Sequence, residues 1–186
     1  MDPDPMSDQS SLAALLELLP LDDLPRTGWV LAGVPRPESI AGHSLGVAQV
    51  ALALAPGCDP PLALDRVLAM AVIHDAPEAR TGDLPRPVGR HLPKGAKRAM
   101  ETSIADELLG SLSPTALEAW REYRDDETRE ARFVHVCDKL QLGVRLVGYV
   151  RSGQRGLEAF AAGLRELECG EFTACERLRQ ELLAEL

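Results

Sequence analysis

Along most of the chain, apolar residues recur every three or four positions, the spacing that places them on one face of a helix. Ser and Thr residues precede several of these stretches, as helix N-caps do, while Pro and Gly separate them. No stretch alternates apolar and polar residues for long enough to predict a strand. The pattern predicts helices over residues 12–19, 39–55, 60–75, 95–109, 114–123 and 128–151, with one or two more after residue 156. We therefore expect an all-α fold.

The length of 186 residues suits one domain with a substantial core. Because 45% of the residues are hydrophobic and only 4% aromatic, that core must consist mainly of Leu, Ala and Val. Residues 1–9 are polar and acidic and are expected to form a disordered tail, so the domain spans residues 10–186. A Pro- and Gly-rich stretch from Pro20 to Pro37 predicts a long loop, and loops of this length are often functional.

The formal net charge of −9 limits the kinds of molecule that the protein is expected to bind. A phosphate backbone or an anionic membrane needs a basic surface, so we expect no long nucleic acid and no membrane as a partner. A small phosphorylated substrate held by one or two Arg side chains remains compatible with this charge. The N-terminus has no signal peptide pattern, and no apolar run approaches the length of a membrane span.

Four cysteines are spread along the chain with spacings that match no zinc-binding or redox motif. We expect reduced thiols in a cytoplasmic protein, packed as small hydrophobic side chains where they lie in apolar runs. The residues concerned are Cys58, Cys137, Cys169 and Cys175.

Four polar residues interrupt the apolar helices in a pattern that suits a divalent metal ion. Such groups are costly to bury unless they are paired or bind a metal, and imidazole with carboxylate is a common ligand set. On a six-coordinate ion, four protein ligands would leave positions for water and for a phosphoryl group. Core histidines that bond to backbone carbonyls are the alternative interpretation. The four residues are His43, the adjacent pair His74 and Asp75, and Asp138.

Other polar residues nearby in the sequence allow two interpretations each. Glu78 lies four residues after His74, so the two residues share one face of the helix if the helix continues that far. There Glu78 could orient or deprotonate a water molecule. Otherwise it is a solvated surface residue. Asp83 follows Gly82 and could simply close a turn. Arg26 suits a phosphate and Trp29 suits a sugar or base, but they could equally be a surface Arg and a core Trp.

Several motifs together resemble one known group of enzymes. The His, His-Asp and Asp frame is combined with a downstream Glu and Gly-Asp and with an upstream Trp. Between about residues 24 and 150 the chain resembles the HD-domain metal-dependent phosphohydrolases, most of all their 5′-deoxynucleotidase branch. The motifs are Arg26-Thr-Gly-Trp29, Glu38-Ser-Ile-Ala-Gly-His43-Ser44, Ile73-His-Asp-Ala-Pro-Glu78, Thr81-Gly-Asp-Leu-Pro85 and Cys137-Asp-Lys-Leu140.

The resemblance implies a single HD-domain helical bundle with the metal site between core helices. It implies one divalent ion per chain (Co, Mn, Mg or Zn), a homodimer, and hydrolysis of deoxyribonucleoside 5′-monophosphates to deoxynucleoside and phosphate. The resemblance also implies roles for single residues. Glu78 would act in catalysis near the attacking water, and Asp83 would act in catalysis in the substrate pocket. Arg26 would bind phosphate and Trp29 would crowd the sugar 2′ position, while the metal would be bound by His43, His74, Asp75 and Asp138.

Two positions depart from the usual pattern of that branch. Gly42 replaces a Glu before the first metal-binding His, where a Glu would complete a capping box with Ser39. Gly28 stands where some members carry the phosphate-binding Arg directly before Trp29, which leaves Arg26 as the nearest upstream Arg. The alternative functions are another HD nucleotide phosphohydrolase, either a phosphodiesterase or a pyrophosphohydrolase, and a non-catalytic helical regulatory module.

Overall fold

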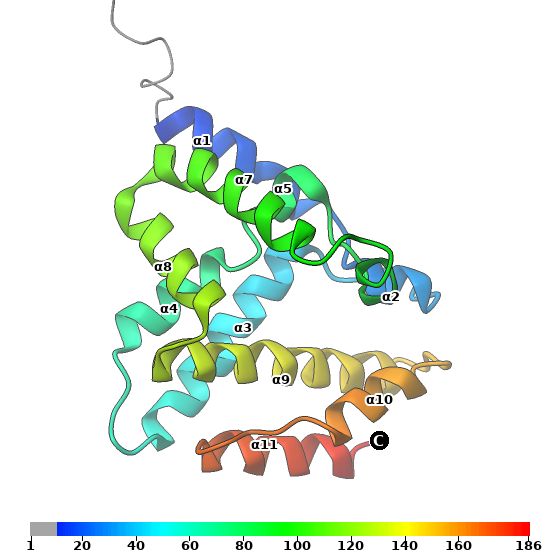
Figure 1. Ribbon diagram of the computed structural model, residues 1–186. Helices are drawn as coiled ribbons and strands as arrows, with labels where there is room; N and C mark the ends of the chain where they lie inside the picture. The colour runs from blue at the N-terminus through cyan, green and yellow to red at the C-terminus, as the bar shows by residue number, and fades with distance from the viewer. Residues whose placement is uncertain (1–10) are drawn as a thin grey trace, which may run out of the picture.

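The computed structural model describes residues 11–186, and this part of the chain is helical, with a single isolated β-bridge between Pro25 and Ser39. The prediction of an all-α fold is confirmed, whereas the predicted disordered tail, residues 1–9, lies outside the described residues. The helices are α1 (Ser11–Leu18), η1 (Leu19–Asp22), α2 (Thr27–Leu31), α3 (Ile40–Leu54), η2 (Ala55–Gly57), α4 (Leu64–Ile73), α5 (Glu78–Thr81), α6 (Arg86–Gly89), α7 (Ala96–Leu112), α8 (Pro114–Asp125), α9 (Arg129–Arg151), α10 (Glu158–Arg165) and α11 (Thr173–Ala184) (Figure 1).

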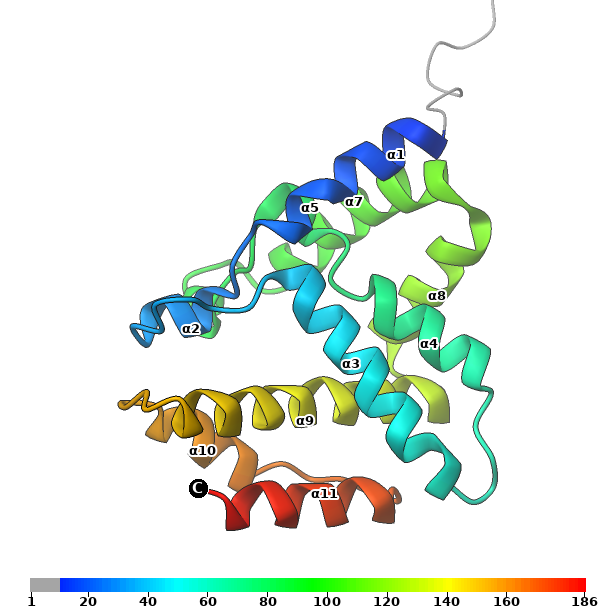
Figure 2. The ribbon, with the colours of Figure 1, turned by 180° about the vertical axis from the view of Figure 1, so that it is seen from behind.

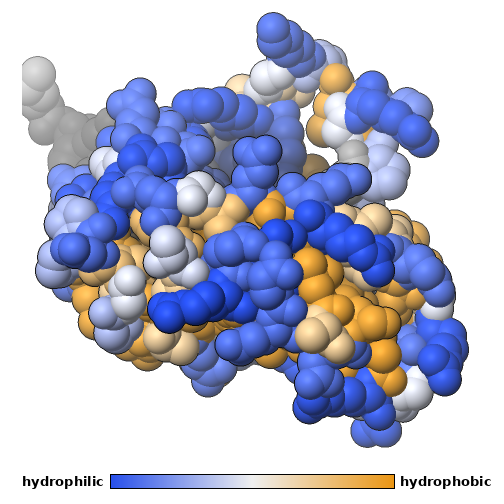
Figure 3. Space-filling view, turned by 90° about the horizontal axis from the view of Figure 1, so that it is seen from below, coloured by the Kyte–Doolittle hydropathy of each residue, from blue (hydrophilic) through white to orange (hydrophobic). Residues whose placement is uncertain are grey.

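Helix α9 is the central element of the bundle. It contacts α3, α4 and α8, and on another side α10 and α11. Helices α1, α7 and α8 lie together at the end of the molecule away from α11, with α1 packed along α7 (Figures 1 and 2). On the face that carries α10 and α11, charged and apolar side chains are interspersed (Figure 3).

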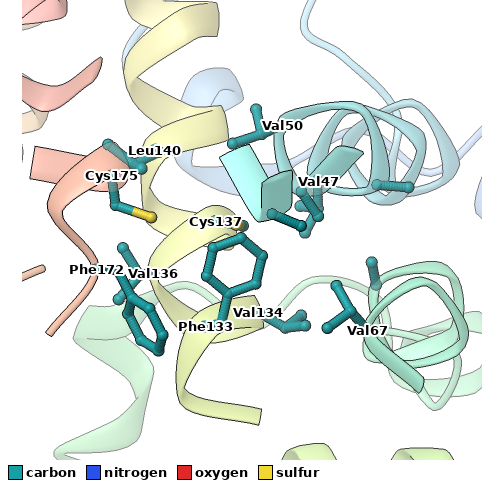
Figure 4. Close-up of a cluster of buried hydrophobic side chains, with 14 of the residues drawn as sticks. Val47, Val50, Val67, Phe133, Val134, Val136, Cys137, Leu140, Phe172 and Cys175 are labelled. Atoms are coloured by element: carbon teal, nitrogen blue, oxygen red, sulfur yellow. The ribbon is translucent and has the colours of Figure 1, made fainter. Parts of the chain in front are cut away.

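The main core lies where α3, α4, α9 and α11 meet (Figure 4). As the composition predicts, Val, Leu and Ala dominate it, and an edge-to-face pair of Phe133 and Phe172 supplies the aromatic rings. Val144, which the helical spacing would place in the core, is instead 44% exposed on α9. All four cysteines are free thiols, and three of them are buried.

The predicted starts of α3, α8 and α9 are correct, and each has a capping side chain. The hydroxyl of Ser39 accepts a hydrogen bond from the Gly42 N–H at 3.0 Å, and that of Thr128 accepts one from the Ala131 N–H at 3.1 Å. The Ser39 bond shows that Gly42 still allows half of a capping box. The predicted start at Pro60 is wrong: Pro61 disfavours helical backbone before it, and α4 begins only at Leu64.

The stretch from Pro20 to Pro37 is more ordered than the predicted loop. It contains the end of η1 and the whole of α2. Two backbone hydrogen bonds of 2.9 Å tie it to the start of α3, one from the Arg26 N–H to the Glu38 carbonyl and one from the Ile40 N–H to the Leu24 carbonyl. This pairing fixes Arg26 close to the first turn of α3.

One prediction about apolar runs needs correction. Residues 40–57 form an 18-residue helical window with a mean hydropathy of 1.3, which is long and apolar enough to cross a membrane by length and composition alone. However, 44% of this window is buried inside the protein. Its buried side packs against α4 and α9 and carries His43, so the window reads as a core helix.

Candidate metal centre

Four polar residues from three elements converge beside the middle of the bundle. His43 comes from α3, His74 and Asp75 follow the last residue of α4, and Asp138 comes from α9. The Nε2 atom of His43 lies 3.0 Å from Oδ1 of Asp138. The Oδ2 atom of Asp75 lies 3.3 Å from Nε2 of His74 and 3.8 Å from Nε2 of His43. One ligand atom from each of His43, His74 and Asp75 lies within 4.8 Å of the other two.

The donor atoms of this cluster fit a divalent metal ion. Four buried side-chain atoms have no hydrogen-bond partner within the described chain, namely Nε2 of both His43 and His74, Oδ1 of Asp138 and Oε2 of Glu78. Unpartnered buried polar atoms are costly. A cation bound among them would satisfy the imidazole and carboxylate lone pairs together, and such a mixed nitrogen and oxygen set is typical of transition-metal sites.

Both imidazoles have the tautomer that metal binding requires. Nδ1 of His43 lies 2.6 Å from the side-chain oxygen of Gln141, and Nδ1 of His74 lies 2.9 Å from the Ala71 carbonyl. An amide oxygen can only accept, so each Nδ1 must carry the proton. Each Nε2 therefore keeps its lone pair for a metal ion. His74 therefore does bond to a backbone carbonyl, as in the alternative interpretation, but it does so through Nδ1, while His43 bonds to a side chain.

Opposite charges keep the carboxylates of the cluster ionised. Burial raises the pKa of Asp75, but the charges of His74 and Arg26 lower it by more, so the net shift is downward. Burial likewise opposes ionisation of Asp138, yet Lys139 and His43 hold the pKa of Asp138 well below its usual range. Two anionic oxygens are thus available at neutral pH.

Glu78 faces the same cluster, although not for the predicted reason. Helix α4 ends at Ile73 and a turn leads into α5, which begins at Glu78, so the helix does not continue through these residues. Glu78 is nevertheless buried, and its Oε2 lies 3.9 Å from NH1 of Arg26. Burial and the charges of Asp75 and Asp83 raise the pKa of Glu78 to about 9. A surface position is therefore excluded, and its carboxyl group carries a proton at neutral pH.

Arg26 and Asp83 lie next to each other beside the cluster. NH1 of Arg26 lies 2.9 Å from Oδ2 of Asp75, so Arg26 is part of the site rather than a surface residue. Oδ2 of Asp83 lies 3.9 Å from Nε of Arg26 and accepts a hydrogen bond from the Thr27 N–H at 2.7 Å. The Thr27 hydroxyl donates to the Asp83 carbonyl at 2.7 Å. Asp83 therefore anchors the start of α2 and, through it, Arg26.

The structure does not bring Trp29 to the metal-binding cluster. Its side chain is 1% exposed, stacks on Phe160 with ring centres 3.9 Å apart and meets Tyr149 edge to face. Its indole N–H donates to Oε1 of Glu38 at 3.0 Å. These are the contacts of a core residue, so its role beside the sugar stays a prediction. A Cβ at Gly28 would lie 3.4 Å from the Phe160 ring, an ordinary contact distance, so this packing does not by itself require glycine there.

Two adjoining cavities open at the site. One, of about 460 Å³, is lined by His74, Asp75 and Asp138 of the cluster and by Glu78. Its cationic lining residues include Lys97, Arg98 and Arg124. The other, of about 790 Å³, has Trp29, Asp83, Phe160 and several leucines in its wall. Arg26, Lys139 and Leu142 line both cavities. A substrate with a phosphate at one end and an apolar group at the other could therefore occupy both.

Sequence reasoning missed several residues that hold the cluster. Gln141 lies three residues after Asp138, so helical spacing could have placed it on the same face of α9. Glu38 lies in the motif that contains His43, but its position in the sequence indicates no role by itself. Trp120, whose indole N–H donates to the His74 carbonyl at 3.2 Å, and Tyr123, whose hydroxyl lies 3.5 Å from Asp138, had no signal in the sequence.

Comparisons with known proteins match the chain over most of its length. A family model described as an HD domain matches residues 21–167, which include the whole cluster. The 5′-deoxynucleotidase hdd1 of Schizosaccharomyces pombe is 31% identical over 150 residues, or 75% of this chain and 73% of that protein. A protein of Pyrococcus horikoshii has a similar structure, with a TM-score of 0.81, 29% identity and coverage of 94% of this chain and 99% of its own. A predicted metal-dependent phosphohydrolase of Magnetospirillum magnetotacticum follows, with a TM-score of 0.66, 26% identity and 94% coverage of both chains.

Proposed function

The chain belongs to the HD-domain family, and we propose that it is a metal-dependent 5′-deoxynucleotidase, which hydrolyses deoxyribonucleoside 5′-monophosphates to a deoxynucleoside and phosphate. The observation that carries this proposal is the group of buried, unpartnered imidazole and carboxyl atoms beneath a cavity lined by cationic side chains. Such an arrangement suits the hydrolysis of a phosphate ester. The similarity to hdd1 supports the substrate class.

His43, His74, Asp75 and Asp138 would hold the divalent ion, either Co, Mn, Mg or Zn, with one ion per chain. When bound, the ion supplies Lewis-acid activation of the phosphoryl group and of water.

The protein's own cations would bind the phosphate. Arg26 has a charged guanidinium: burial lowers the pKa of Arg26, but the charges of Asp75, Asp83, Asp138 and Glu78 raise it by more. Lys139 stands at the junction of the two cavities, and Lys97 lines the cavity over the cluster. A guanidinium binds phosphate oxygens through paired N–H groups, whereas ammonium groups act as point charges.

The adjoining cavity would receive the nucleoside. Its wall contains Phe160, Leu142 and Leu167, which offer apolar contacts to a base of any identity. Trp29 lies in the same wall, and its bulk there would crowd the 2′ position of a ribose. Phosphate and nucleoside would meet near Arg26 and Lys139, the charged residues common to both cavities.

Hydrolysis needs a proton to leave the attacking water and another to reach the 5′-oxygen of the sugar. Glu78 is the candidate for the first task once it is ionised, and a cation bound beside its buried, unpartnered Oε2 would favour that ionised form. General acid or base groups typically contribute about 10²- to 10⁴-fold. Asp83 is the candidate for the second task, although its carboxylate also accepts the Thr27 N–H.

A panel of ribo- and deoxyribonucleoside mono-, di- and triphosphates, assayed for phosphate release with Mn, Co, Mg and Zn, tests this function. We expect the deoxyribonucleoside monophosphates to be the best substrates. Pyrophosphate release from triphosphates, or cleavage of a diester, would favour the other HD phosphohydrolases. If protein purified without chelator retained under about a tenth of an equivalent of metal and were inactive, the regulatory module would be favoured.

We also propose a cytoplasmic homodimer that binds neither membranes nor long nucleic acids. Exposed leucines support the dimer: Leu12, Leu15, Leu16 and Leu19 repeat at positions i, i+3, i+4 and i+7, and all are more than half exposed. Leu45 and Leu52, seven residues apart on α3, are exposed as well. Helices α1 and α3 are both at the front in Figure 2. An apolar face is complementary to its own copy, as a two-fold dimer requires, and contiguous exposed apolar patches mark interaction sites.

A further inference from the structure

Behind the metal-binding cluster, a row of hydrogen bonds connects α3, α9 and the start of α2. Nδ1 of His43 lies 2.6 Å from Oε1 of Gln141, and Nε2 of Gln141 donates to Oε2 of Glu38 at 2.7 Å. Glu38 also accepts from Nε1 of Trp29 at 3.0 Å and from Nε of Arg145 at 2.9 Å. The side chains of His43 and Glu38 are 0% and 1% exposed, so water does not compete for these bonds.

The donors and acceptors in this row of hydrogen bonds follow from the groups that surround Glu38. The indole N–H of Trp29 and the guanidinium N–H of Arg145 can only donate, so both oxygens of Glu38 must accept. The amide end of Gln141 that faces Glu38 must then be its NH₂ group. Its carbonyl oxygen therefore faces His43, and Nδ1 of His43 must carry the proton.

We propose that Glu38 and Gln141 are positioning residues that fix the tautomer of His43 and so make Nε2 its metal-binding nitrogen. The proposal rests on the metal centre described above but not on any substrate. It also gives Trp29 a second task, because its indole N–H is one of the two donors that fix the orientation of Glu38. The wall of the nucleoside cavity and the metal-binding cluster are thereby linked by hydrogen bonds.

Gly46 on α3 supplies the space that Gln141 needs. A Cβ atom at Gly46 would lie 2.7 Å from Nε2 and 2.8 Å from Cγ of Gln141, closer than real contacts allow. A side chain at this position would therefore displace Gln141 from His43. Glycine inside a helix is unfavourable by about 1 kcal/mol relative to alanine, and the passage of Gln141 accounts for its presence here.

His74 provides an internal comparison. Its Nδ1 donates to the backbone carbonyl of Ala71, three residues earlier, so its tautomer is set by the helix itself. Within the described residues neither Gln141 nor Glu38 bonds to His74, although the His43 ring meets the His74 ring edge to face, with ring centres 5.4 Å apart. Changes to Gln141 or Glu38 should therefore alter the tautomer of His43 and leave that of His74 unchanged.

The first experiment measures the tautomers directly in chelator-treated protein, by long-range proton–nitrogen correlation spectra of the histidine rings at alkaline pH. We expect Nδ1–H for both histidines in the natural sequence. Gln141→Leu, which removes the acceptor, should give His43 a mixture of both tautomers. Glu38→Gln should give a smaller change, because the new amide no longer imposes one orientation on Gln141. An unchanged His43 tautomer in both variants would overturn the proposal.

The second experiment measures metal affinity by calorimetric titration with Mn or Co, without substrate. Loss of a partner that orients a metal-binding His typically costs about 10- to 100-fold in affinity, and we expect this loss for Gln141→Leu and for Gly46→Ala. Gly148→Ala is the matched control, since a Cβ at Gly148 in α9 meets nothing within 4 Å. Both glycine variants should fold, as judged by circular dichroism and thermal melting of chelator-treated protein.

The outcomes separate this proposal from the proposed function. Equal metal affinity in Gly46→Ala and Gly148→Ala, with both folded, would refute the role of Gln141. A natural protein that binds metal and shows the expected tautomers but hydrolyses no nucleotide would leave the positioning role intact and refute the nucleotidase.

Discussion

Trp29 is one of the residues for which the sequence allowed two interpretations, and its replacement gives the sharpest test of the structure. Its side chain is 1% exposed, with a stacked partner in Phe160, an edge-to-face partner in Tyr149 and a hydrogen bond to Glu38. Trp29→Ala removes all of these contacts. Trp29→Phe keeps a ring for Phe160 and Tyr149, but it removes the N–H donor and part of the volume of the indole.

The two substitutions should differ in cost for reasons visible in the structure. Truncation of a buried Trp to Ala typically lowers the free energy of unfolding by about 3–5 kcal/mol through lost burial and the cavity that remains. In Trp29→Phe, Oε1 of Glu38 loses its hydrogen-bond donor while Oε2 keeps Gln141 and Arg145. An unpaired buried acceptor costs about 1–3 kcal/mol. We therefore expect Trp29→Phe to be clearly destabilised, but less than Trp29→Ala.

Urea denaturation of chelator-treated protein, followed by far-ultraviolet circular dichroism, measures both free energies. A second assay measures phosphate release from ribo- and deoxyribonucleoside monophosphates, with metal added and at a temperature below the melting temperature of each variant. It gives the ratio of the activities on the two sugars. If Trp29 also walls the sugar site, Trp29→Ala should shift that ratio toward ribonucleotides by about ten- to a hundredfold. A loss below about 1 kcal/mol in Trp29→Ala would refute the reasoning from burial, and an unchanged ratio would confine Trp29 to the core.

His74→Ala should abolish metal retention, measured by elemental analysis, and should lower the melting temperature only in the presence of metal, because bound metal stabilises the folded state. Glu78→Gln should lower turnover by about 10²- to 10⁴-fold while metal is retained. In chelator-treated protein, Glu78→Gln should be more stable than the natural chain by a margin that grows from about pH 5 to about pH 8. The reason is that Glu78 releases its proton near pH 4.5 when unfolded but keeps it when folded, where its pKa is raised to about 9; equal urea midpoints at pH 8 would contradict this. Leu15→Glu combined with Leu16→Glu should give a monomer in light scattering, and a retained dimer would exclude the α1 face. Arg26→Ala should raise KM for ribo- and deoxyribonucleotides alike through lost phosphate contacts; a change confined to one sugar would refute that role.

The helices could be predicted because their signals are local. The side chains of Ser39 and Thr128 accept hydrogen bonds from backbone N–H groups three residues later. The apolar pattern that follows each of these caps can be recognised from neighbouring residues alone. The start of α4 could not be predicted this way. Ala63, which precedes it, has no capping side chain of its own, and its N–H donates to the carboxylate of Glu130, 67 residues away.

The residues of the candidate metal centre could be singled out for a different reason. His43 and Asp138 are polar residues at buried helix positions, and the cost of burying them unpaired points to a ligand. Glu78 illustrates the limit of spacing: it was expected to share a face with His74 on a continued helix, whereas α4 ends at Ile73 and a turn brings Glu78 to the same place. The supporting residues depend on pairings across the bundle. Glu38 and Gln141 are 103 residues apart, and no local pattern connects them.

One face of α9 explains how these long-range pairings arise together. Asp138, Gln141, Arg145 and Tyr149 follow one another at intervals of three or four residues, so they lie along one side of the helix. Asp138 meets His43, while Gln141 and Arg145 meet the carboxylate of Glu38, and the Tyr149 hydroxyl accepts the Glu38 N–H at 2.8 Å. A single rigid helix thus sets the distance between the metal-binding cluster and the segment that carries Arg26 and Trp29. A rotation of α9 would therefore move Asp138 away from His43 and, at the same time, Gln141 and Arg145 away from Glu38.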